Sequence, residues 1–256
     1  MKINKLLMIS LLCLMLAGFD QISFAAESSL LGSNSNIIVD GDIIKLDLTK
    51  QPKMINSSIS KVKAKKSNDG QGYKVHLELH LDKNENIKNL RVIEYNKKTN
   101  EFTVETGILE SNDIKSEGNF LRSDSYASVT YKSWSWDPAG IVLNWIWTNL
   151  DWHYNDSNIT SYDGSYDDYA YHGITNWYLS SPVQFSKSGN PSWCQADADA
   201  SYVNYDFMDD DLSTYVIYDD NKALGYPDGS ADGQCDISVS GEYYWLLGYN
   251  SLLQRN

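Results

Sequence analysis

YKVHLELHL, residues 73–81, alternates apolar and polar side chains without a break. Because successive side chains of a β-strand point to opposite faces, the apolar residues share one face and His76, Glu78 and His80 share the other. This alternation is typical of an antiparallel sheet that buries one face and exposes the other to solvent. The His-x-Glu-x-His spacing can hold Zn²⁺ or Cu²⁺ when a fourth ligand is supplied, but we interpret these residues as an exposed polar face.

The rest of the chain repeats this strand-like pattern in short segments. Strands are expected at residues 37–39, 43–46, 59–66, 90–95 and 102–108, and then at 126–136, 141–147, 152–154, 174–179, 196–207, 214–218 and 238–245. Gly, Pro and Asp preset turns at residues 40–41, 137–140, 162–164, 188–191 and 227–229. Only Ser251–Gln254 could pass for a helical turn. We therefore predict an all-β fold, with an antiparallel β-sandwich or barrel preceded by a small antiparallel β unit.

The composition divides the chain sharply near residue 122. Residues 26–122 carry 15 Lys and Arg against 14 Asp and Glu, whereas residues 123–256 carry 4 against 19, a net charge of −15. All eight Trp and sixteen of the eighteen Tyr lie in the second part. This asymmetry predicts two units. Their bounds are 26–36 for a flexible leader, 37–108 for the small β domain, 109–124 for a linker and 125–256 for the sandwich domain.

Residues 1–25 have the features of a signal peptide. Lysines precede an uncharged apolar run over residues 6–19, which has the length of a signal-peptide core and is short for a bilayer span. Small residues at Ser23 and Ala25 predict cleavage before Ala26. We therefore expect a secreted, extracellular protein without a membrane span.

Cys194 and Cys235 are the two cysteines that remain after this cleavage. An even pair in an exported chain predicts a disulfide bond. The bond would close a loop of about 40 residues and contribute roughly 4 kcal/mol on the chain-entropy model. The alternatives are two reduced, buried thiols, or a cysteine nucleophile, although His153 and His172 show no spacing that is diagnostic of a thiol enzyme.

Two segments share the pattern Asp-Gly-Ser-x-Asp, at residues 163–167 and 228–232. The second continues to Gly233 and resembles the first half of an EF-hand calcium loop, in which positions 1, 3 and 5 supply oxygens and Gly at position 6 makes the bend. Val239 occupies position 12, where a carboxylate completes such a loop. Hairpin-turn composition explains the same residues. The calcium hypothesis names as ligands Asp228, Ser230, Asp232, Asp236, Asp163, Ser165 and Asp167.

A further acidic cluster begins at Asp197 and Asp199, which share a strand face roughly 7 Å apart. Two carboxylates this close raise each other's pKa unless a cation lies between them. Three interpretations stay open: a metal site, a solvated polar face, or a catalytic acid pair for glycoside hydrolysis. In the last case one of these residues acts with Asp206, Asp209, Asp210 or Asp211.

The aromatic residues are the third feature of the second half. Trp134 with Trp136, and Trp145 with Trp147, are i, i+2 pairs that we expect in the sandwich core, because indoles bury large areas. Three tyrosines instead lie in an Asp-rich, loop-like stretch where no core pattern explains them. Their rings can stack on sugars, and we interpret them as a ligand-binding surface. They are Tyr166, Tyr169 and Tyr171.

These observations favour a secreted, non-catalytic β protein that binds an extracellular surface ligand such as a glycan, with calcium as a stabilising ion. The sequence contains no nucleophile elbow, zincin, Walker or dinucleotide-binding motif. The charge of −15 disfavours nucleic acid and anionic membranes as partners. The alternatives are a secreted glycoside hydrolase that uses the paired aspartates, and a structural adhesin or toxin component.

Overall fold

The computed structural model describes residues 37–47, 49, 53–68, 70–109, 125–137, 139–155, 157–173, 176–207 and 212–256. The predicted signal peptide, the leader, residues 110–124 of the linker, and Asp209, Asp210 and Asp211 lie outside these residues. Within the described part of the chain, no helix is long and apolar enough to cross a membrane.

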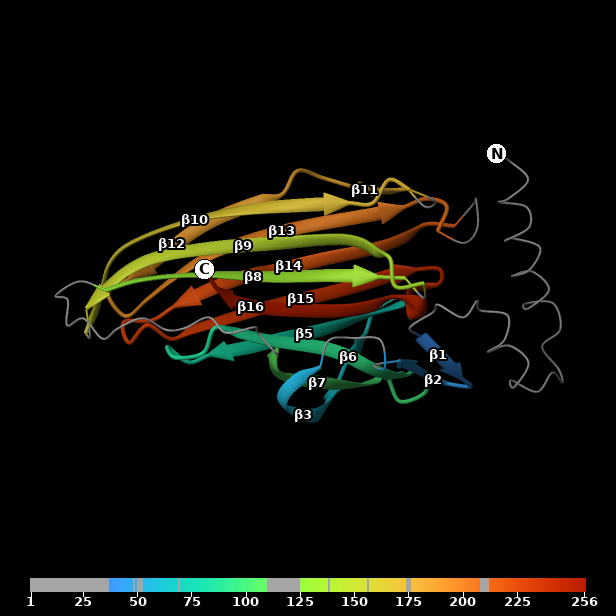
Figure 1. The fold of residues 1–256 in the computed structure, drawn as a ribbon. Coiled ribbons are helices and arrows are strands. Elements are labelled where there is room, and N and C mark those ends of the chain that lie inside the picture. Colours follow the sequence, from blue (N-terminus) through green and yellow to red (C-terminus); the bar gives the residue numbers. More distant parts are fainter. Residues whose placement is uncertain are drawn as a thin grey trace, which may run out of the picture.

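Two antiparallel sheets pack face to face, which confirms the predicted all-β sandwich (Figure 1). Sheet A contains β1 (Ile37–Asp40), β2 (Ile43–Leu46), β3 (Met54–Lys63), β6 (Ile87–Asn96), β7 (Glu101–Leu109), β8 (Ser125–Trp136), β9 (Val142–Asn155), β10 (Asn158–Ala170) and β16 (Gly248–Arg255). Sheet B contains β4 (Lys65–Lys66), β5 (Gly72–Leu81), β11 (Trp177–Leu179), β12 (Gln184–Asn190), β13 (Trp193–Asn204), β14 (Thr214–Gly225) and β15 (Ala231–Gly241). A short 3₁₀ turn, Tyr244–Leu246, precedes β16.

The strand order places the earliest and latest strands side by side. Sheet A runs β3-β7-β6-β16-β8-β9-β10, and the β1–β2 hairpin attaches to β6. Sheet B runs β11-β13-β14-β15-β5-β4, with β12 also paired to β13. The β5–β6 hairpin therefore straddles the sandwich, with β5 beside β15 in one sheet and β6 beside β16 in the other.

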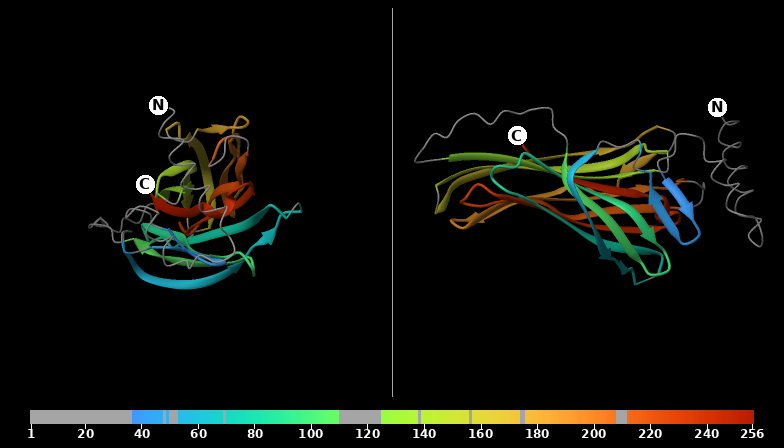
Figure 2. Two further views of the ribbon diagram at one scale, coloured as in Figure 1. Left: turned by 90° about the vertical axis from the view of Figure 1, so that its right-hand side faces the viewer. Right: turned by 60° about the horizontal axis from the view of Figure 1, so that its bottom comes forward.

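Both sheets thus contain strands from each side of the predicted linker. β5 pairs with β15 from Leu81 opposite Ala231 to Gly72 opposite Ser240. The apolar face of the 73–81 stretch is buried, as its alternation predicts, and joins a hydrophobic core that extends from β2 to β16. Figure 2 shows the blue and green strands of the first half lying against the red strands of the second.

Three strands of the structure, β10, β12 and β16, are not predicted by the sequence pattern. β10 covers residues 162–164, where Tyr-Asp-Gly predicts a turn. Most of its side chains are exposed because β10 lies at the edge of sheet A, so no apolar alternation marks it. β16 covers Ser251–Gln254, the stretch that could pass for a helical turn, and it buries small polar side chains such as Ser251 inside the sandwich.

Large rings of sheet A fill gaps left by glycines of sheet B. A Cβ added to Gly233 would meet the Tyr131 ring at 2.1 Å, and one added to Gly225 would meet the Trp152 ring at 2.8 Å. Tyr131 and Trp152 are fully buried. Each glycine therefore admits a ring that any larger residue would exclude.

The predicted disulfide is wrong, because Cys194 and Cys235 are free, buried thiols. Cys194 lies on β13 and Cys235 on β15, and β14 runs between them. Strands two places apart are separated by roughly 10 Å, whereas bridged cysteines have Cα atoms less than about 7 Å apart. Burial raises the pKa of Cys194 to about 12, as expected of an inert structural thiol.

We predict that Gly233→Ala lowers the free energy of unfolding by about 1–3 kcal/mol, because the added methyl group overpacks the core against Tyr131. The control is Gln234→Ala on the outward side of the same strand, for which a change within about 0.5 kcal/mol is expected. Urea denaturation measures both. Equal losses in the two variants would show that the glycine gap does not control the packing.

Candidate functional site

Three aromatic side chains form a row across the outer face of sheet A, the face turned away from sheet B. Tyr169 of β10 pairs with Trp145 of β9, which pairs with Trp134 of β8. The rings of Trp145 and Tyr169 are nearly parallel, with centroids 5.8 Å apart and 14° between their planes. The alternation that buries Ile146 turns Trp145 to the outside. Tyr169 is 38% exposed and both indoles are partly exposed, so we call these three residues the aromatic row.

Of the four tryptophans expected in the core, only Trp136 is buried, at 6% exposure. Trp134, Trp145 and Trp147 lie partly exposed on the outer face. Trp134 and Trp136 pair with Asn250 and Gly248 of β16 without a register shift, and the Trp136 ring lies against Gly248, so the two indoles share one face of β8. The i, i+2 spacing therefore predicts a shared face correctly for both pairs, but that face is the outer one, and of the four indoles only Trp136 is buried there.

A cation and a carboxylate border the aromatic row. Lys132 of β8 places its ammonium group 4.2 Å from the centroid of the Trp145 ring, within the range of a cation–π interaction. Partial burial lowers the pKa of Lys132. On the opposite side of β9, Asp167 of β10 pairs across the strands with Trp147.

A chain of hydrogen bonds continues from the aromatic row along the same face. Asn256 donates to the side-chain oxygens of Asn149 at 2.6 Å and of Thr130 at 3.0 Å. Asn149 donates to one carboxylate oxygen of Asp151 at 2.7 Å, and the hydroxyl of Tyr126 donates to the other at 2.7 Å. We call these five residues the polar network. Its amides, hydroxyls and carboxylate are the groups that exchange hydrogen bonds with ligand hydroxyls.

The three tyrosines predicted to bind a ligand do not share a surface. Tyr169 belongs to the aromatic row. Tyr166 points to the other side of β10, toward sheet B, with its ring centroid 5.1 Å from that of Phe185. Residues three apart in a strand face opposite sides, which separates the two. Tyr171 follows the end of β10, where its backbone N–H donates to the carbonyl of Leu143.

The first predicted calcium segment is part of a strand instead of a turn. Asp163, Ser165 and Asp167 occupy alternate positions of β10 and point to the outer face of sheet A. Asp163 forms an ion pair with Lys187, which lowers the pKa of Asp163. Asp167 accepts a hydrogen bond from the backbone of Asp168 at 2.9 Å. An extended strand spreads these oxygens along a line and does not gather them around one ion.

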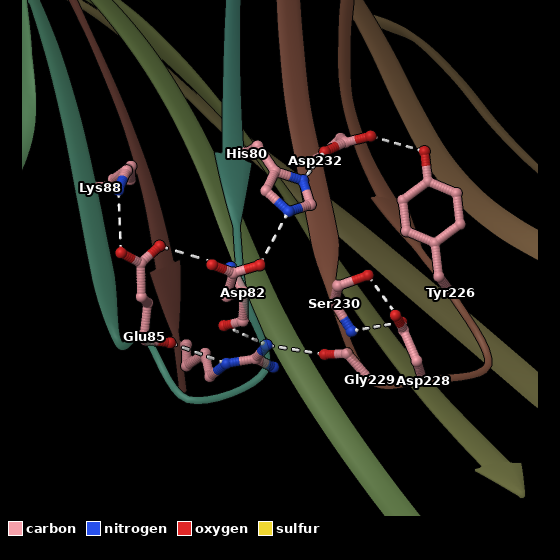
Figure 3. Close-up of polar contacts among 10 residues, drawn as sticks. His80, Asp82, Glu85, Lys88, Tyr226, Asp228, Gly229, Ser230 and Asp232 are labelled. Atoms are coloured by element: carbon pink, nitrogen blue, oxygen red, sulfur yellow. Dashed lines mark hydrogen bonds and ion pairs between the residues drawn. The ribbon is translucent and has the colours of Figure 1, made fainter. Parts of the chain in front are cut away.

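The second predicted calcium segment begins in the turn between β14 and β15 (Figure 3). Ser230 donates its backbone N–H and its hydroxyl to one oxygen of Asp228, at 2.9 and 2.6 Å, and these bonds lower the pKa of Asp228. Gly229 has a φ of 83°, in the left-handed region that favours glycine. Arg255 of β16 donates to the Gly229 carbonyl at 2.6 Å. The Asp228 carboxylate therefore caps its own turn.

The last two residues of that segment, Asp232 and Asp236, lie on the outer face of sheet B. His80 Nδ1 is 2.6 Å from Asp232 Oδ1, and His76 Nδ1 is 2.6 Å from Asp236 Oδ1. Tyr226 donates its hydroxyl to the other oxygen of Asp232 at 2.6 Å (Figure 3). The bond to Asp232 raises the pKa of His80. The predicted exposed polar face of β5 is confirmed, and its imidazoles contact the carboxylates of β15.

Asp197, Asp199 and Asp220 form an acidic group in which one carboxylate oxygen of each residue lies within 4.8 Å of the others. Lys222 Nζ is 3.6 Å from Asp197 and 3.1 Å from Asp220, so an ammonium group already neutralises part of this charge. Asp199 accepts the backbone N–H of Asp220 at 2.7 Å, and burial raises the pKa of Asp197. The sequence did not add Asp220 to the pair, because a register shift in β14 brings it there.

No known protein family, curated protein or solved structure gives a significant match to this chain. The outer face of sheet A is the candidate site, because it combines partly exposed rings with hydrogen-bonding side chains on one surface. Sequence reasoning identified Tyr169 of this face but missed the polar network. The polar network could have been found from the two-residue spacing of β9, which places Asn149 and Asp151 on the same side of the strand as Trp145.

We predict that Asp228→Ala lowers the free energy of unfolding by about 1–2 kcal/mol, equally in calcium and in EDTA, because the carboxylate accepts hydrogen bonds from Ser230. Thermal denaturation in the two buffers measures this. Ser230→Ala removes the hydroxyl that donates to Asp228, and its loss of stability should also be the same in calcium and in EDTA. A loss confined to the calcium buffer would instead make this segment a calcium site.

Proposed function

We propose that this protein is a secreted, non-catalytic β-sandwich protein that binds a neutral glycan on the outer face of sheet A. The aromatic row carries the proposal. Tyr169, Trp145 and Trp134 lie on adjacent strands, so their rings are spaced by the strand separation of roughly 5 Å. Ring faces of this kind offer apolar surface to the C–H groups of sugar rings, while Tyr and Trp retain a polar tip.

The polar network supports the same ligand class. Asn149 and Asp151 of β9 follow Trp145 on one face, and Asn256 reaches them from the end of β16. Their amide and carboxylate groups match the hydroxyls of a sugar in donor and acceptor character. Asp151 and Asp167 also give this face negative charge that repels anionic sugars, which favours a neutral glycan.

Secretion is part of this proposal and rests on the residues at the start of the chain. Lysines, an apolar run over 6–19 and the small residues before Ala26 make a signal peptide. A glycan of a cell surface or an extracellular matrix is then accessible to the mature protein.

Trp145→Ala is expected to weaken binding to immobilised neutral polysaccharides by about thirtyfold, because a central aromatic anchor contributes about 2 kcal/mol or more. Tyr169→Ala should weaken it less, since Tyr169 lies at the edge of the row. Binding is measured on an array of neutral polysaccharides and then by titration of intrinsic Trp fluorescence.

The matched control is Tyr215→Ala. Tyr215 is 37% exposed, against 38% for Tyr169, but it lies on β14 in sheet B. This variant should bind as the original protein does. Equal weakening by Tyr215→Ala and Trp145→Ala, or binding confined to anionic polysaccharides, would contradict the proposal.

A glycoside hydrolase is the second candidate, and the Asp197 group is the observation that favours it. Retaining glycosidases place two carboxyl groups about 5 Å apart, with the pKa of the acid raised. Asp197 and Asp199 have oxygens within 4.8 Å, and burial raises the pKa of Asp197.

Reducing-end assays on each bound polysaccharide distinguish the two candidates. Under our proposal the protein releases no new reducing ends. The hydrolase is supported instead if the protein releases reducing ends and if Asp197→Asn and Asp199→Asn abolish that release. Asp232→Asn, also on the outer face of sheet B, is the control and should leave the release unchanged.

A further inference from the structure

Two edge strands of sheet A, β3 and β10, have opposite charge; β1 is a further edge strand. No strand of the described residues pairs with the outer side of β3 or of β10. β3 contains two lysines, Lys61 and Lys63, and no acidic residue, whereas β10 contains three aspartates and no Lys or Arg. Figure 1 shows β3 and β10 on opposite sides of the sandwich.

Both edges also expose apolar side chains. Ile59 of β3 is 70% exposed and Ile55 is 43% exposed. On β10 the tyrosines are 37–39% exposed. Edge strands with unpaired backbone groups are templates for pairing with another chain, and exposed apolar residues add area that such pairing removes from water.

The charged side chains of the two edges belong to the same face of the sheet. Ile59 of β3 pairs with Glu105 of β7, whose carboxylate is 2.8 Å from Arg91 of β6. Arg91 and Trp134 of the aromatic row both pair with Asn250 of β16, from opposite sides, so Ile59 and Trp134 lie on the same face of sheet A. Lys61 and Lys63 follow Ile59 at two-residue steps and therefore share this outer face. Asp163 and Asp167 share it too, since both lie an even number of residues from Tyr169 on β10.

The direction of the strands decides how two edges can meet. Six antiparallel pairings connect β3 to β10, through β7, β6, β16, β8 and β9, so the two edge strands run in the same direction. When a second molecule is displaced sideways, perpendicular to the strands of sheet A, its β3 lies beside β10 of the first molecule, and the two strands are parallel. In that position Lys61 and Lys63 of one copy face Asp163 and Asp167 of the other on one surface.

We infer that the β3 edge of one copy of this chain adds to the β10 edge of a second copy, so that sheet A continues from molecule to molecule. β3 is regular from Ser58 to Lys63, after an irregularity between Ile55 and Ser58, and this segment contains both lysines that the pairing uses. The contact is head-to-tail, which leaves a free edge at each end and permits growth. The twist of the sheet makes the resulting array helical. This association does not require a bound glycan.

The lysines already have some intramolecular charge compensation. Lys61 and Lys63 are 3.1 and 4.0 Å from Glu101, but their side chains remain 63% and 83% exposed. Exposed pairs of this kind contribute little and exchange readily. Lysines on an edge strand can also serve to prevent pairing, and the experiment below separates that role from the one inferred here.

The test is a charge swap, with association measured by analytical ultracentrifugation of the purified protein. The original protein should associate at low ionic strength, and its association constant should fall at least tenfold in about 0.5 M salt, where the Debye length is only a few ångströms. K61E/K63E and D163K/D167K should each be monomeric, because in each variant the two edges carry like charge. Mixing the two variants should restore association, since each then meets a complementary edge.

K83E is the control, because it reverses an exposed lysine in the turn between β5 and β6, and this variant should associate as the original does. Circular dichroism confirms that each variant is folded. A protein that is monomeric at low salt, or a mixture of variants that stays monomeric, would overturn the inference. Stronger association of K61E/K63E on its own would show that the lysines guard the edge.

Discussion

Two glycines of sheet B set how closely the sheets of this sandwich approach each other. Gly225 and Gly233 leave the space that the rings of Trp152 and Tyr131 fill. Because these rings enter the core from sheet A, the alternating residues of the same strands must point outward. The aromatic row and the polar network therefore lie on the outer face of the same strands whose inner face carries these rings. Their arrangement on one face depends on strands whose inner faces are held by close-packed rings.

The pairing of β5 with β15 explains how the acidic second half of the chain is compensated. Asp232 and Asp236 of β15 contact His80 and His76 of β5. Lys74 of β5 adds an ammonium group 3.0 Å from Asp236, and, although burial opposes it, these partners keep the pKa of Asp236 below its ordinary value. The first half thus supplies part of the positive charge that the second half lacks. The compositional boundary does not separate the charges in space.

The end of β16 connects the two sheets at the tip shown in Figure 3. Arg255 belongs to sheet A and donates to the carbonyls of Glu85 at 2.9 Å and Asp82 at 3.1 Å, in the turn where the chain crosses between sheets. It also donates to Gly229, in the β14–β15 turn of sheet B. Carbonyls that would be unpaired in the turns are satisfied by one side chain from a distant strand. Burial lowers the pKa of Arg255, yet guanidinium stays charged at any physiological pH.

The sequence by itself determined the fold class and most strands that bury one face, because apolar alternation records burial directly. The 73–81 stretch shows this best. It also identified the turns at 137–140 and 227–229, where Gly and Asp carry the backbone requirement. Only the tertiary structure decided which strands lie at an edge and which face of each strand is turned inward, because apolar alternation does not contain this information. An exposed edge such as β10 has no buried face to mark it, and the same spacing that puts Trp145 on one face of β9 does not say whether that face is inner or outer. Likewise, cysteine number cannot reveal that β14 lies between Cys194 and Cys235, because strand order is set by pairings between residues far apart in the chain.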